Sequence, residues 1–136
     1  TIMAGNWVAE KAKIPNFFPA LVKPKAEKIG PQIEATFSAA YKAGVKIAFG
    51  TDAGVFGHGK NGYEFILMNE AGMPVLEAIK SATVTAADLL GQSDLIGSIE
   101  PGKAADIIAV PGDPVADVKL MTKVNFVMKD GKVYKN

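Results

Sequence analysis

The chain has 136 residues, of which 49% are hydrophobic and 21% are charged, and its formal net charge is +1; this composition fits one globular core and excludes an intrinsically disordered chain. It contains no cysteine, which excludes disulfides, cysteine-ligated zinc, iron–sulfur clusters and thiol nucleophiles. All 15 basic residues are lysines, and the absence of arginine, the usual partner of guanine edges and phosphates, argues against specific nucleic-acid binding.

The first 31 residues are predicted to be irregular, because proline at high density interrupts long helices. The prolines of this segment are Pro15, Pro19, Pro24 and Pro31. A helix is predicted from Pro31 to about Ala43, since proline suits the first helical turn and apolar residues then recur at helical spacing. Gly44 is a typical residue to end such a helix.

A short apolar strand, Val45–Phe49, is predicted next, and we expect it to be buried in a mostly parallel sheet. A glycine-rich stretch follows and runs to Gly62. Beyond it, the spacing of apolar residues and the positions of glycine predict three helices, over residues 63–71, 74–82 and 85–90.

The pattern changes from helical to two-residue periodicity after Gly91. Residues 96–102 carry a strand-and-turn signal, and Asp106–Val110 is predicted to be a β-branched strand. Two more strands, Val124–Met128 and Val133–Tyr134, flank Asp130-Gly131, a dipeptide preferred in two-residue hairpin turns.

Asp52 is the position at which a functional interpretation competes most strongly with a structural one. It follows the predicted strand Val45–Phe49 and lies between Gly50 and Gly54. In parallel α/β architectures, active sites are built at the carboxyl ends of the strands. An aspartate beside glycine is also ordinary turn chemistry. Position alone therefore leaves both interpretations open.

Several motifs that follow one another along the chain add to this pattern. They are Ala43-Gly-Val-Lys-Ile-Ala-Phe-Gly-Thr-Asp-Ala-Gly54, Glu70-Ala-Gly-Met73, Glu77-Ala-Ile-Lys-Ser-Ala-Thr83, Ala86-Ala-Asp-Leu-Leu-Gly91, Gly97-Ser-Ile-Glu-Pro-Gly-Lys-Ala-Ala-Asp106 and Gly112-Asp-Pro114. In this order and at these separations, they closely resemble the C-terminal part of the amidohydrolase superfamily of metal-dependent hydrolases. The nearest branch is the imidazolonepropionase-like, Xaa-Pro dipeptidase-like and metallo-carboxypeptidase one. The resemblance covers about residues 36–136.

The resemblance implies an α/β fold, the C-terminal portion of a distorted (β/α)8 TIM barrel together with part of a small β-sandwich-like composite domain. The change of periodicity near residue 92 agrees with this division. We therefore assign residues 1–92 to the C-terminal strands and helices of a partial barrel. Residues 93–136 are assigned to the β-strand segment of the composite domain.

The resemblance also implies roles for residues of the glycine-rich stretch. In such enzymes the aspartate after the last barrel strand is a metal ligand and proton shuttle, and Asp52 occupies that position. A carboxylate there can accept a proton from the attacking water and pass it to the leaving amine. His58 is expected to contact substrate, for instance a peptide carboxylate, and Asn61 to line the pocket. For His58, metal ligation and a surface position without a role remain alternatives.

Most of the metal ligands of the family have no counterpart in this sequence. The family binds one or two divalent metal ions, with zinc expected, through a His-x-His pair, usually a carboxylated lysine, and two further histidines. This chain has a single histidine, His58, so it offers at most two ligands together with Asp52, whereas catalytic zinc takes three protein ligands. A complete barrel also needs about 250 residues. We therefore expect a fragment, inactive alone, whose other ligands lie in a missing N-terminal segment of the same enzyme.

The leading hypothesis is a hydrolase of amide (C–N, peptide) bonds, a dipeptidase or carboxypeptidase-like enzyme acting on a small peptide or amide substrate. A cyclic-amide hydrolase or deaminase of the imidazolonepropionase kind is the alternative within the superfamily, and a non-catalytic α/β binding remnant is the alternative outside it. We expect no nucleic-acid partner, and no membrane partner because no apolar run approaches about 18–20 residues. A homo-oligomer is expected for the full-length protein. The sequence does not determine the compartment, and a soluble, cytoplasmic location is favoured.

Overall fold

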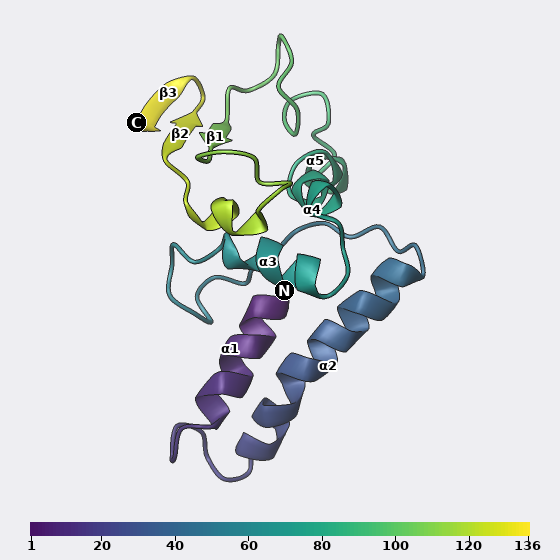
Figure 1. Ribbon diagram of the computed structural model, residues 1–136, viewed down its shortest axis with the longest axis vertical. Helices are drawn as coiled ribbons and strands as arrows, with labels where there is room; N and C mark the ends of the chain where they lie inside the picture. The colour runs from purple at the N-terminus through teal and green to yellow at the C-terminus, as the bar shows by residue number, and fades with distance from the viewer.

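The computed structural model describes residues 1–136 as a mixed helix-and-strand structure. Its elements are α1 (Ile2–Ala12), α2 (Lys23–Lys42), α3 (Tyr63–Glu70), α4 (Val75–Ser81), α5 (Val84–Leu89), β1 (Ile107–Ala109), the short 3-10 helix η1 (Val118–Thr122), β2 (Phe126–Lys129) and β3 (Lys132–Lys135). In Figure 1, α1 and α2 form a helical hairpin at one end, and the sheet lies at the other end beyond α3. None of the helices combines the length and the apolar character that crossing a membrane requires.

The prediction that residues 1–31 are irregular is wrong, because three of the four prolines lie outside helix interiors and the fourth, Pro31, does not interrupt its helix. Pro15 and Pro19 lie in the connection between α1 and α2. Pro24 stands in the first turn of α2, where a missing N–H leaves no intrahelical bond unmade. Pro31 lies inside α2, so the helix predicted from Pro31 begins at Lys23 instead.

Glycines bring α1 and α2 close together. A Cβ added to Gly30 would lie 3.0 Å from the Cβ of Ala9 and 3.1 Å from the carbonyl oxygen of Gly5. A Cβ added to Gly5 would lie 2.8 Å from Cδ1 of Ile33. The Gly30-Pro31 pair therefore marks the place where two helices cross, and not the place where a helix begins.

The predicted buried strand Val45–Phe49 is not formed. Val45 is 55% exposed, and the segment belongs to no sheet. A strand needs a neighbouring strand for its hydrogen-bond ladder, and the sheet of this structure consists of β1, β2 and β3. The segment is held at its end instead. The Phe49 N–H donates to the carbonyl oxygen of Ser81 at 3.0 Å, and the Phe49 ring stacks on Phe65 with 4.4 Å between centroids.

The three helices predicted after Gly62 are confirmed as α3, α4 and α5. Together with α1 and η1, α3 and α4 contribute to one buried cluster. Its members are Ile2, Phe65, Met68, Ala71, Met73, Ala78 and Met121. The core therefore joins segments from the beginning, the middle and the C-terminal part of the chain.

The C-terminal strands are also confirmed, as an antiparallel sheet in the order β1-β2-β3. Ile108 lies opposite Val127, and Met128 lies opposite Val133. Asp130 and Gly131 connect β2 and β3 with φ values of 50° and 75°, as a type I′ hairpin turn requires. Residues 96–102, where a strand signal was expected, contain no strand. The division of the chain near residue 92 remains a prediction.

An ion pair at this hairpin makes its stability depend on pH. Lys129 Nζ donates to the Asp106 carboxylate at 2.8 Å, and this bond, with a second from the Asp130 N–H, lowers the pKa of Asp106 below its ordinary 3.8. The bond to Asp106 also raises the pKa of Lys129 above 10.5. The contribution of Asp106 is present above 3.8 and is lost as the pH falls through its lowered pKa. That of Lys129 is present below 10.5 and is lost as the pH rises through its raised pKa.

We expect Lys129→Met to raise the pKa of Asp106 toward its ordinary value, because the first hydrogen-bond donor to the carboxylate is removed. An NMR titration of the Asp106 side chain measures this shift. Lys132→Met on the neighbouring strand β3 is the matched control and should leave the titration unchanged. An Asp106 that titrates at the same pH in the wild-type protein and in Lys129→Met would contradict the assignment of the shift to Lys129.

Candidate functional site

The three residues predicted to form the site, Asp52, His58 and Asn61, lie on one loop between the end of α2 and the start of α3. In Figure 1, the chain leaves the end of α2, crosses the molecule and forms a loop before it enters α3. All three residues are exposed. The structure therefore places them on the same surface loop, with side chains accessible from outside the chain.

The backbone at Asp52 is in the left-handed region, with φ of 53°. Among residues with a side chain, aspartate and asparagine adopt this region most readily. The Asp52 carbonyl oxygen accepts a hydrogen bond from the Val55 N–H at 3.2 Å, which closes the turn. The turn chemistry considered for Asp52 is thus real, and it is compatible with a functional carboxylate, because the backbone makes the turn and the exposed side chain takes no part in that bond.

Buried contacts hold the loop on both sides of its exposed residues. Before Asp52, Phe49 is fixed by its bond to Ser81 and its stacking on Phe65. Within the loop, Phe56 is 3% exposed and its carbonyl oxygen accepts from the Gly54 N–H at 3.2 Å. At the end of the loop, a Cβ added to Gly62 would lie 2.4 Å from the carbonyl oxygen of Met121. In the sequence of the loop, the buried Phe56 therefore separates the exposed residues Asp52 and His58.

A complete metal site is not present among these residues. No group of three or more His, Asp or Glu side chains lies close enough together to hold a metal ion. Asp52 fits as a single ligand, because it is exposed at the first position of a turn. A catalytic metal takes about three protein ligands, so the donor set of this chain alone does not fit a catalytic metal centre.

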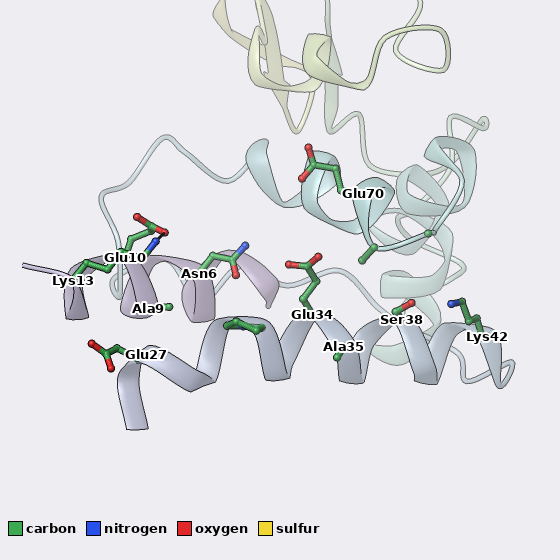
Figure 2. A pocket seen from close by; sticks show the side chains of 13 residues that line it. Asn6, Ala9, Glu10, Lys13, Glu27, Glu34, Ala35, Ser38, Lys42 and Glu70 are labelled. Atoms are coloured by element: carbon green, nitrogen blue, oxygen red, sulfur yellow. Dashed lines mark hydrogen bonds and ion pairs between the residues drawn. The ribbon is translucent and has the colours of Figure 1, made fainter. Parts of the chain in front are cut away.

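Two hollows of the structure lie away from these three residues. A groove of about 780 Å³ runs between α1, α2 and the end of α3. Its lining includes Glu10, Lys13, Glu34 and Glu70, and Figure 2 shows Glu10 paired with Lys13 there. A second, mostly apolar hollow of about 730 Å³ lies between α4, α5 and β1. Neither is lined by Asp52, His58 or Asn61.

Glu64 is a residue that the sequence analysis missed. It lies in the first turn of α3 and is only 2% exposed. Its two carboxylate oxygens accept the N–H groups of Ile2 and Met3 at 2.7 and 2.8 Å. An acidic residue in a first helical turn is ordinarily read as a solvated partner of the helix dipole. Its neighbours in the sequence give no signal that it is buried, since Tyr63 is 50% exposed and the contact of Glu64 is with the distant start of α1.

Comparisons with known proteins agree with the motif order along the chain. Residues 6–134 match the sequence profile of the Amidohydrolase family. Ochratoxinase from Aspergillus niger is 39% identical over 103 residues, which are 73% of this chain and 21% of that protein. Imidazolonepropionase from Geobacillus kaustophilus (strain HTA426) is 38% identical over 68 residues, which are 48% of this chain and 16% of that protein.

Among solved structures, a crystal structure of a Xaa-Pro dipeptidase with bound methionine in the active site is similar, with a TM-score of 0.96 and 56% identity. The match covers 99% of this chain and 33% of that one. This chain thus spans about a third of the length of the dipeptidase and about a fifth of the length of ochratoxinase. The chain belongs to the amidohydrolase family, and the resemblance stated from its motifs is confirmed.

Proposed function

We propose that this member of the amidohydrolase family is part of a metal-dependent hydrolase that cleaves the C–N bonds of small peptides, with dipeptides as its substrates. The observation that carries the proposal is the similarity to the Xaa-Pro dipeptidase structure, at 56% identity over 99% of the chain. Membership of the amidohydrolase family supports the same class of reaction.

Residues 45–49, which form no strand in this chain, support the proposal that the rest of the protein completes a barrel. Residues 45–49 are an apolar, β-branched segment without a partner strand, and Val45 is exposed. An unpaired segment of this kind is a template for neighbouring strands. We infer that an N-terminal segment of the full-length protein pairs with it and completes a (β/α)8 barrel. The same segment would bring the remaining metal ligands to the end of the strand at which Asp52 lies.

In this proposal Asp52 is a metal ligand and the proton shuttle. A bound divalent metal ion, with zinc expected, would polarise the substrate carbonyl and lower the pKa of the water molecule that attacks it. The Asp52 carboxylate takes the proton of the attacking water and delivers it to the leaving amine. His58 and Asn61, exposed on the same loop, are placed to contact the substrate, with the His58 imidazole binding its carboxylate.

A second candidate is a cyclic-amide hydrolase or deaminase. It is favoured by the identity of 38% to imidazolonepropionase over 68 residues and of 38% to 5-methylthioadenosine/S-adenosylhomocysteine deaminase from Thermoanaerobacter pseudethanolicus over 82 residues. These two matches cover only 48% and 53% of the chain, whereas the match to the Xaa-Pro dipeptidase covers 99%. We therefore rank the second candidate below the dipeptidase.

The test is a substrate comparison with the full-length protein supplied with zinc. We expect kcat/KM to be highest for a Xaa-Pro dipeptide, lower for an N-acyl amino acid, and lowest for a cyclic amide. Removing the metal with a chelator should abolish hydrolysis, and adding zinc back should restore it. A higher kcat/KM for the cyclic amide, or release of ammonia from an aminopurine, would favour the second candidate. A zinc-loaded protein that hydrolyses none of these substrates would indicate a non-catalytic remnant.

A further inference from the structure

A buried carboxylate links two helices at the base of the Asp52 loop. Glu64 of α3 is 2% exposed, and Ile2, the first residue of α1, has no exposed surface. The two oxygens of Glu64 accept the N–H groups of Ile2 and Met3 at 2.7 and 2.8 Å. These N–H groups belong to the first turn of α1 and have no partner within their own helix. Glu64 therefore satisfies both, and its charge also interacts favourably with the positive end of the α1 dipole.

Both ends of the loop that carries Asp52 lie next to this contact. At one end, a Cβ added to Gly50 would lie 3.6 Å from Cγ2 of Thr1, the residue before α1. At the other end, Gly62 packs against the backbone of Met121 and stands two positions before Glu64. The bonds from Glu64 to the start of α1 thus connect the segment that enters the loop with the helix that follows it.

We propose that Glu64 is a positioning residue for Asp52: by tying the start of α1 to the start of α3, it fixes the two ends of the loop that carries the carboxylate. The catalytic part of this inference rests on the proposed function of Asp52. The alternative is that Glu64 only caps α1 and stabilises the fold. The two differ in their consequences, because a cap changes the free energy of unfolding and leaves the folded enzyme at full activity.

Glu64→Gln separates the two roles with little change of shape. The two N–H groups are bound by different oxygens of Glu64, and the amide replaces one of these oxygens by an NH2 group, which then faces an N–H donor with a donor. Glu70→Gln is the matched control, since Glu70 lies on the same helix, undergoes the same change of charge and is exposed. In neither variant is the Asp52 side chain itself altered.

The experiment measures kcat, KM, zinc content and amide hydrogen exchange in the full-length, zinc-loaded protein, well below the melting temperature. For Glu64→Gln we expect kcat to fall by about 10–100-fold with KM and zinc content nearly unchanged, because a catalytic group displaced by about 1 Å loses rate without losing substrate contacts. Amides of residues 51–62 should exchange faster than in the wild-type protein. Glu70→Gln should match the wild-type protein in all four quantities.

A Glu64→Gln protein with a lower melting temperature but wild-type kcat and wild-type exchange over residues 51–62 would overturn the proposal and leave Glu64 as a helix cap. If the wild-type protein hydrolyses no substrate, the proposed function fails, and the exchange of residues 51–62 alone decides whether Glu64 holds the loop. Should Glu64→Gln not fold, Glu64→Asp takes its place. It keeps the charge but is too short for both bonds, and intermediate values of kcat and exchange are expected. Wild-type values of both would again overturn the proposal.

Discussion

Replacing Asp52 by asparagine in the full-length protein is expected to lower kcat by about 10²–10⁴-fold, the usual cost of removing a positioned proton acceptor. An amide cannot accept the proton of the attacking water at neutral pH, and it is a weaker metal ligand than a carboxylate. KM should change little, because the substrate contacts proposed for His58 and Asn61 lie elsewhere on the loop. Steady-state kinetics at matched zinc content is the measurement.

The left-handed backbone at position 52 makes this substitution a clean one. Asparagine adopts a φ near 53° as readily as aspartate does, so the turn should survive in Asp52→Asn. Asp52→Gly gives a second control, since glycine also tolerates this φ and removes the carboxylate entirely. Asp52→Ala would add backbone strain to the loss of the side chain, and its effect could not be assigned to either cause alone.

The same substitution decides between the two interpretations of Asp52. If Asp52 only forms the turn, asparagine and glycine are among its best replacements, and both variants should remain active. Activity of Asp52→Asn within about threefold of the wild-type value, at equal zinc content, would end the catalytic assignment, because a proton shuttle cannot be replaced at so small a cost.

The parts of the fold that the sequence predicts correctly are those determined by neighbours close in the chain. Helices α3, α4 and α5 follow apolar spacing over a few residues and glycine stops, so local periodicity was enough to find them. The β2–β3 hairpin follows from Asp130-Gly131, whose positive φ values are a property of the turn itself. Asp52 was selected on a local signal of the same kind, its place after an apolar segment and between glycines, and its role stays a prediction.

The parts that were missed depend on contacts between segments far apart in the chain. α2 continues through Pro31 because Gly30 packs against α1, and proline content alone does not reveal this crossing. Residues 45–49 have the composition of a strand but no partner strand within the chain. Glu64 is buried because the start of α1 lies over it, 62 positions away in the sequence. No local pattern carries this information.

Gly62, just before α3, leaves no room for a Cβ against the backbone of the C-terminal segment. A Cβ there would lie 2.4 Å from the carbonyl oxygen of Met121 and 3.0 Å from its carbonyl carbon. Both atoms belong to backbone, which cannot turn aside as a flexible side chain can. Met121 is 7% exposed and belongs to the core cluster, so η1 and α3 would have to separate where they are packed.

We therefore expect Gly62→Ala to lower the free energy of unfolding by about 1–3 kcal/mol, the usual cost of overpacking a well-packed site. Urea unfolding of the full-length protein measures the change. Gly57→Ala in the same loop is the matched control, because a Cβ at Gly57 meets nothing within 4 Å, and its stability should be close to that of the wild-type protein. Equal stability of the two variants would mean that η1 does not pack on α3 as closely as these distances require. A loss confined to Gly62→Ala, by contrast, would show that the C-terminal segment supports the helix that follows the Asp52 loop.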